Sequence, residues 1–160
     1  MQDIEPLEPA MWFGAIAKIE QRRMRSTEVE FDRLLRHAYH LLQLTPRPLR
    51  SIIQSELSEA QYDTLLEAQA LESAAMGLIG QPMRYGLVRL IAGHFEAKVW
   101  LTDSAEPTSV HSTFVASALL GAWAQTILAM DTRSAELEVS NPHPAQHKAR
   151  YVRRPRQFEH

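Results

Sequence analysis

Histidine and carboxylate side chains suited to acid–base chemistry meet once in this sequence, just before a long apolar segment. His111 follows Asp103 and Glu106 and precedes the apolar residues that we expect to form a helix. Unpaired amides at the start of such a helix can stabilise an oxyanion, while a carboxylate orients the imidazole as a general base. His111, Asp103 and Glu106 are therefore candidate catalytic residues. The structural alternative is that His111 caps the helix or lies in an interface.

An enzyme built on His111 predicts a concave apolar pocket beside it. Trp100, Phe114 and Trp123 are the large aromatic residues closest to His111 in the sequence, and we take them as candidate pocket residues. They would hold an acyl-type or other apolar substrate, or a small apolar ligand if the chain is not an enzyme.

The C-terminal segment is basic although the chain as a whole has a net charge of −2. Residues 148–160 carry five cations and one carboxylate, which leaves residues 1–147 with 12 cations and 18 carboxylates. Candidate residues for contact with a partner or with nucleic acid are Lys148, Arg150, Tyr151, Arg153, Arg154 and Arg156. Arginine engages phosphates and tyrosine stacks on bases, but the acidic remainder repels a polyanion. The favoured interpretation is docking to a protein partner or a structural role, since a basic edge strand prevents unwanted strand pairing.

Histidines that could ligate a metal occur as two pairs, His37 with His40 and His143 with His147. Arg33 lies on the same predicted helix as the first pair and opposes a cation, and no acidic residue or cysteine lies near the second pair. We therefore predict no metal site. Phosphate-binding glycine loops, nucleophile elbows and zinc-protease motifs are absent from the sequence, and we predict no cofactor.

The elements that must position these residues begin with helices over the first 80 residues. Apolar side chains recur at helical spacing from Pro9 to about Arg25, and a capping-box pattern at Thr27 predicts a second helix that stops at residues 45–48. A short helical segment over residues 49–57 follows. Ser58 starts a further capping box, which predicts one helix running through Met76.

Strand patterns begin at Met83, where the apolar period changes from helical to two. Residues 87–92 are almost wholly apolar, which predicts a central strand, and Gly93-His94 turns the chain into an alternating strand over residues 95–101. A second hairpin is predicted from the alternation over residues 135–140 and a last strand over residues 148–154.

The segment from Val110 to Met130 carries no charged side chain and is apolar on every face of a helix. Polar residues dilute it and no basic cluster flanks it, so we predict a buried central helix and no membrane span. Small residues such as Gly121 permit close approach of another backbone, which suits a central helix or a dimer interface.

Length and patterning together predict one α+β domain over residues 1–160. A helical layer (1–80) precedes a β-β-α-β-β unit (83–154), in which a four-stranded, mostly antiparallel sheet packs on the long apolar helix, and a basic tail (155–160) follows. The chain has no cysteine and its N-terminal residues lack a secretory signal pattern, which favours a cytoplasmic protein.

These expectations lead to three hypotheses for the function. Because no catalytic constellation stands out, the first hypothesis is a non-enzymatic binding or regulatory module, a homodimer that holds a protein partner or a small apolar ligand. The alternative is a small enzyme with His111 as general base. A third hypothesis is weak, salt-sensitive nucleic-acid binding through the basic tail.

Overall fold

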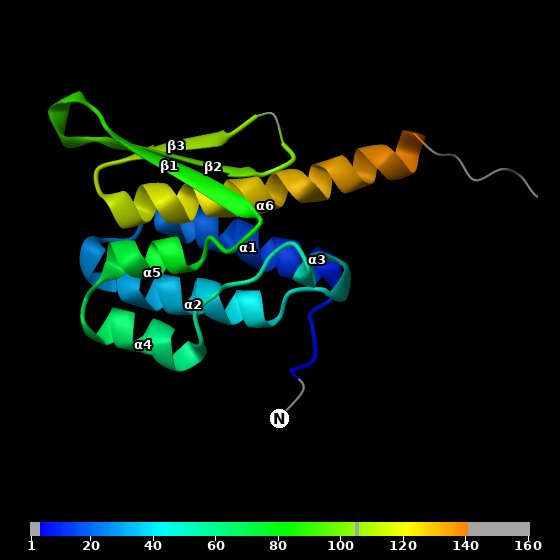
Figure 1. Cartoon of the computed structure of the whole chain (residues 1–160), viewed down its shortest axis with the longest axis horizontal. Helices are drawn as coiled ribbons and strands as arrows, with labels where there is room; N and C mark the ends of the chain where they lie inside the picture. The colour runs from blue at the N-terminus through cyan, green and yellow to red at the C-terminus, as the bar shows by residue number, and fades with distance from the viewer. Residues whose placement is uncertain (1–3, 105, 141–160) are drawn as a thin grey trace, which may run out of the picture.

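The chain starts with helices and continues into a sheet and one long helix (Figure 1). The computed structural model describes residues 4–104 and 106–140, with side chains as far as Arg133. The elements are α1 (Pro9–Arg23), η1 (Glu28–Glu30), α2 (Phe31–Gln43), α3 (Arg47–Arg50), α4 (Glu59–Glu67), α5 (Leu71–Gly77), β1 (Met83–Arg89), η2 (Ile91–Gly93), β2 (Phe95–Leu101), β3 (Thr108–Ser112) and α6 (Val115–Ser140).

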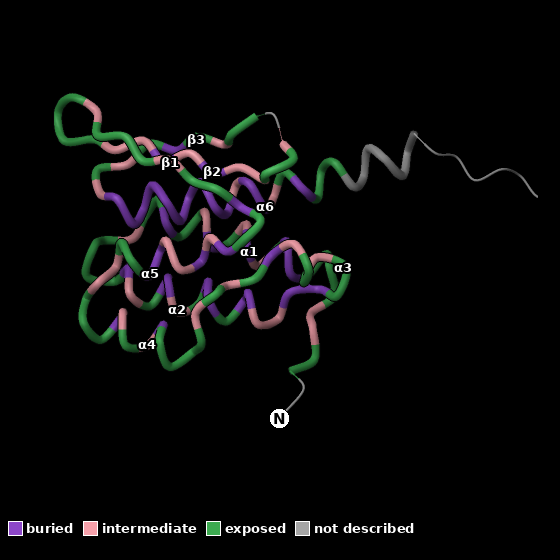
Figure 2. Tube along the Cα trace, viewed as in Figure 1, coloured by how far each residue is buried: buried purple, intermediate pink, exposed green. Residues whose placement is uncertain are grey.

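Helix α6 lies at the centre of the fold. Strands β2 and β3 pack on one side of it, α1 and α5 pack on the other, and α2 and α4 form the outer helical layer (Figures 1 and 2). Leu119, Trp123 and Ile127 of α6 are completely buried, and each contributes about 1.5–3 kcal/mol by leaving water. The prediction of a buried apolar helix that carries the sheet is confirmed, but the helix begins at Val115, whereas we expected it to begin at Val110.

The sheet has three antiparallel strands in the order β1-β2-β3. The hairpin of β1 and β2 is confirmed. Ala97 and Val99 of β2, with Val110 of β3, are buried on the face of the sheet that packs on α6. The expectation that residues 87–92 form a central strand is wrong. β1 is an edge strand and β2 is central, because the third strand pairs with β2 through residues 108–112.

The predicted four-stranded sheet and β-β-α-β-β order are wrong, because the described chain runs β-β-β-α after the helical layer. Residues 135–140, expected as a strand, continue α6. Their alanine, leucine and glutamate residues favour helix, and no glycine or proline between Ala122 and Ser140 interrupts it. The other strand of that hairpin, residues 148–154, and the tail over 155–160 lie outside the described residues.

The helical layer follows the capping patterns at one position and departs from them at another. At Ser58 the capping box is complete. Ser58 Oγ accepts a hydrogen bond from the backbone N–H of Gln61, and Gln61 Oε1 accepts one from the backbone N–H of Ser58. The hydroxyl of Thr27 instead donates to Glu30, and a short η1 precedes α2. The single helix expected from Ser58 to Met76 is broken at Gln69, whose φ is 55°.

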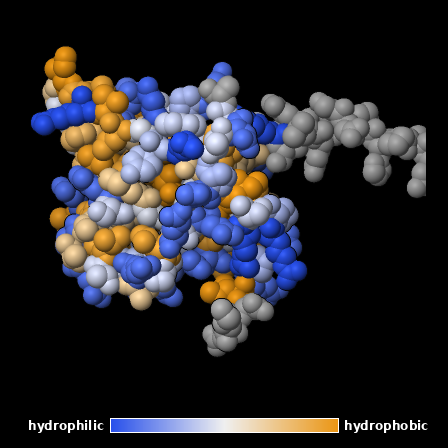
Figure 3. All heavy atoms as spheres, in the orientation of Figure 1, coloured by the Kyte–Doolittle hydropathy of each residue, from blue (hydrophilic) through white to orange (hydrophobic). Residues whose placement is uncertain are grey.

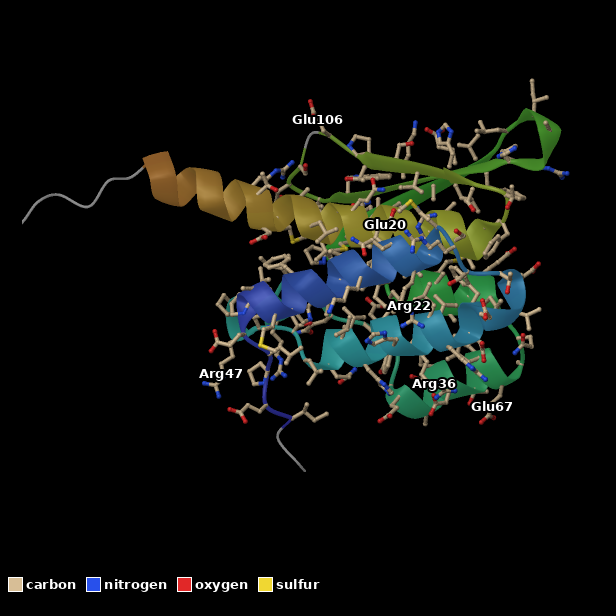
Figure 4. All side chains as sticks on the ribbon, turned by 180° about the vertical axis from the view of Figure 1, so that it is seen from behind. Glu20, Arg22, Arg36, Arg47, Glu67 and Glu106 are labelled. Carbon is tan, nitrogen blue, oxygen red and sulfur yellow. The ribbon has the colours of Figure 1, made fainter. Side chains whose placement is uncertain are left out.

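A polar cluster connects α1 to α6 within this core. Arg23 forms a two-pronged ion pair with Glu20, with both nitrogen–oxygen distances at 2.6 Å. Ser117 Oγ accepts a hydrogen bond from Arg23, and the Gln125 side chain donates one to Glu20. Two polar side chains of α6 thus supply hydrogen bonds to the charged pair of α1. Figure 4 shows Glu20 between the two helices.

Candidate functional site

One face of the sheet is left open to solvent by the described elements, because α6 covers only the other face (Figure 1). Strand alternation and register place seven side chains on the open face. They are Arg84 and Val88 of β1, Glu96, Lys98 and Trp100 of β2, and Ser109 and His111 of β3. The open face is therefore mostly polar, with one tryptophan.

Glu96 is the centre of a polar cluster on this face. Its Oε1 atom accepts a 2.6 Å hydrogen bond from Ser109 Oγ, and it lies 3.4 Å from His111 Nε2 and 3.6 Å from Lys98 Nζ. The Ser109 hydrogen bond, with the nearby charge of Lys98 and the contact with His111, holds the pKa of Glu96 below its ordinary value. Glu96 is thus an anion shared by three partners.

The cluster contains serine, histidine and carboxylate, but its geometry differs from that of a nucleophile with its base. In such a site the histidine accepts the serine proton, and the carboxylate orients the histidine. Here the Ser109 hydroxyl donates to Glu96 directly, and the side chain of His111 is 62% exposed. The arrangement gives an ordered polar surface.

The three candidate catalytic residues are not brought together. His111 lies in β3 opposite Glu96, so the helix-start environment expected for it is absent. Asp103 and Glu106 are exposed in the connection between β2 and β3, at the other end of β3 from His111. Figure 4 shows Glu106 at this connection. The carboxylate that contacts His111 is Glu96, which the sequence reasoning missed because cross-strand register is not readable from spacing.

The three candidate pocket aromatics also lie apart. Trp123 is completely buried in the core, and its Nε1 atom has no hydrogen-bond partner among the described residues. Phe114 packs edge-to-face on Phe31 with ring centroids 4.9 Å apart. Trp100 lies on the open face, where an ideal Cβ on Gly86 would approach its ring to 3.8 Å.

Trp100 lines an open groove at the end of the hairpin that lies nearer the helical layer. The groove has a volume of about 590 Å³, and Arg84, Tyr85 and Thr102 contribute to its walls with Glu56 and residues 79 and 81–83. This groove runs along β1 and combines an aromatic ring with a guanidinium group. Among the described residues, Trp100 is thus a predicted pocket residue that borders a sizeable hollow.

The free edge of β1 is the most apolar exposed part of the described chain. Of eight exposed large apolar side chains, four lie on β1 and the turn after it, namely Tyr85, Leu87, Val88 and Ile91. Ile91 is 94% exposed, and Figure 3 shows orange side chains gathered over this hairpin at the upper left. Among the described strands β1 pairs with β2 alone, so no described strand pairs with the backbone groups of its other edge.

The remaining candidates do not add to the open face. His40 lies 3.8 Å from Glu59, and His37 lies 3.4 Å from an Arg22 nitrogen. Within residues 4–104 and 106–133, no three histidine or acidic side chains are grouped as a metal site would require. The six candidate contact residues of the basic C-terminal segment lie outside the described residues.

None of the helices in the described part of the chain has the length and apolar character needed to span a membrane. Comparison of the chain with protein-family models, with curated proteins and with solved structures found no match.

Proposed function

We propose that this chain is a non-enzymatic protein-binding module that works as a homodimer, with β1 as the strand that contacts the second copy. The observation that carries the proposal is the concentration of exposed apolar side chains on an unpaired edge strand. Soluble proteins usually shorten, charge or cover such edges, because an open edge pairs with other chains. β1 is seven residues long, and alternate residues along it present their N–H and C=O groups at the outer edge.

Pairing of β1 with β1 of a second copy has one register that uses the whole strand. A two-fold axis through Gly86 places Tyr85 opposite Leu87, and Arg84 opposite Val88, on matching faces of the sheet. No two cations then lie opposite each other across the axis. The exposed apolar side chains of β1 would gain neighbours from the second copy on each face of the sheet, and each new backbone hydrogen bond would contribute about 0.5–1.5 kcal/mol.

The same register creates a surface for a further protein partner. Gly86 has no side chain, and Trp100 lies over it, so the axis passes between two tryptophan rings, one from each copy. Arg84 of each copy lies beside them. Aromatic and arginine side chains dominate the binding energy of protein interfaces, and this pairing would gather four of them on the open face.

The experiment is sedimentation of the full chain over a range of concentrations, with Val88 as the tested position. A dimer has twice the 18.2 kDa of the chain. Val88→Lys places a cation opposite Arg84 of the second copy and should weaken the dimer at least tenfold. Val88→Glu places an anion there and should retain it.

Folding of the single chain responds in the opposite direction, which separates loss of the dimer from loss of the fold. Val88 pairs with Glu96 in the hairpin, so lysine at 88 gains an attractive neighbour within the chain and glutamate gains a repulsive one. Val29, which is 89% exposed on η1, supplies the matched control Val29→Lys. A monomeric wild-type chain at high concentration, or equal weakening by Val88→Lys and Val29→Lys, would reject the proposal.

A further inference from the structure

A second hollow lies between the end of α1 and the start of α2, away from the sheet. It has a volume of about 330 Å³ and is lined by Gln21, Arg22, Arg25, Ser26, Glu30 and Arg33. We call these six residues the arginine hollow. Figure 4 shows Arg22 between α1 and α2. Three guanidinium groups thus border one small concave surface of a chain whose residues 1–147 are net acidic.

Within the described residues, no ion pair neutralises the three guanidinium groups of the arginine hollow. Among the described residues, no carboxylate lies within ion-pair distance of Arg22, Arg25 or Arg33. Glu30 is the single acidic residue of the lining, and it accepts a hydrogen bond from the Thr27 hydroxyl at 3.3 Å. Like charges held around one hollow repel each other, so a bound anion would lower their energy.

His37 lies next to the arginine hollow, beside Arg22. Its Nδ1 atom lies 3.4 Å from an Arg22 nitrogen, and partial burial, followed by the Arg22 guanidinium and His40, lowers the pKa of His37. The neighbourhood therefore disfavours additional positive charge. A ligand that carries negative charge is the complement of such a site.

We propose that the arginine hollow binds a small phosphate-bearing anion. Arginine presents a planar fork of donors that matches phosphate oxygens, and three forks can engage one or two phosphate groups at once. Gln21 supplies a neutral donor at the rim, whereas the Ser26 hydroxyl already donates to the Arg22 carbonyl oxygen at 2.7 Å. The volume is at the lower end of the range for small-molecule sites, which fits a diphosphate-sized ligand better than a large cofactor.

Titration of the full chain with inorganic pyrophosphate, followed by the NMR signals of the arginine Nε–H groups, tests the proposal. Saturable binding with a dissociation constant below about 1 mM is expected, with the largest shifts at Arg22, Arg25 and Arg33. The pair of substitutions Arg25→Gln and Arg33→Gln should weaken binding at least tenfold. Both residues are exposed, so the fold should tolerate the change.

Two controls separate this site from general attraction to cations. Arg47→Gln removes an exposed arginine of α3, at the far end of the helical layer in Figure 4, and should leave pyrophosphate binding unchanged. Substitution of Arg153, Arg154 and Arg156 by glutamine tests the basic C-terminal segment. Absence of saturable binding would overturn the proposal. So would equal weakening by either control, or binding of an oligonucleotide without binding of pyrophosphate.

Discussion

The guanidinium group of Arg23 occupies the space that a side chain at Gly121 would need. A Cβ atom on Gly121 would lie 2.6 Å from Arg23 Nε and 2.9 Å from Val110 Cγ1. Arg23 is held in place by Glu20 and Ser117, so it cannot move aside without breaking buried hydrogen bonds. The glycine in α6 thus lets a helix of the N-terminal layer deliver a charged group into the core.

Gly121→Ala should therefore destabilise the chain even though alanine favours helix. Overpacking of a filled core costs about 1–3 kcal/mol, and we expect a fall of that size in the free energy of unfolding measured with urea. Gly14→Ala is the matched control, because Gly14 is also helical and a Cβ there meets nothing within 4 Å. That variant should be stabilised by about 0.5–1 kcal/mol. Similar changes at both glycines would contradict the packing argument.

The two capping-box sequences predict opposite sensitivities to alanine. Ser58→Ala removes the hydroxyl that accepts from the Gln61 amide, so stability should fall by about 0.5–2 kcal/mol. Thr27→Ala should change stability much less, because the Thr27 side chain makes no capping hydrogen bond. Thermal unfolding of the two variants compares them directly. A larger loss from Thr27→Ala would mean that the second cap forms in solution.

Local residue patterns were sufficient to predict the elements whose structure depends on nearby residues. Apolar spacing predicts α1, α2 and the buried part of α6, and alternation with Gly93 predicts the first hairpin. The alternation over residues 135–140 misled because alanine, leucine and glutamate satisfy a strand pattern while favouring helix.

The remaining features of the fold and of the candidate site depend on strand order and register, and neither can be deduced from local residue spacing. Residues 87–92 are apolar enough for a central strand. β3 nevertheless pairs with the other edge of β2, so β1 is an edge strand and Leu87 and Val88 are exposed. Register also brings Glu96 to His111 and Ser109, which no spacing rule indicates across two strands. The candidate site therefore depends on long-range pairing, which a single sequence does not encode in a readable form.

The Ser109 hydroxyl should control the titration of Glu96. Because that hydrogen bond is the largest cause of the lowered pKa, Ser109→Ala should raise the pKa of Glu96 toward its ordinary value of 4.5. A lowered carboxyl pKa contributes stability above the ordinary value, and this contribution is lost as the pH falls through the folded pKa. Carbon-detected NMR titration of the Glu96 carboxyl measures the shift.

Lys98→Met is the companion variant for Glu96, since it removes the next attractive group without touching the hydrogen bond. It should raise the pKa of Glu96 by less than Ser109→Ala does. The reverse order would mean that charge, and not the hydroxyl, holds the carboxylate ionised.

Titration of His37 gives the most direct measure of the charge around the arginine hollow. Partial burial, the Arg22 guanidinium and His40 lower the pKa of His37 below its ordinary value of 6.5. Since the unfolded chain then binds a proton more readily, the contribution of His37 to stability is present above pH 6.5 and is lost as the pH falls through its folded pKa. Arg22→Gln should raise that pKa, measured by proton NMR of the imidazole, and should flatten the dependence of stability on pH in this window.

Arg47→Gln should change neither quantity, because Arg47 lies on α3, away from His37 on α2 (Figure 4). If Arg22→Gln leaves the pKa unmoved, the guanidinium does not act on the imidazole, and burial or His40 must account for the shift.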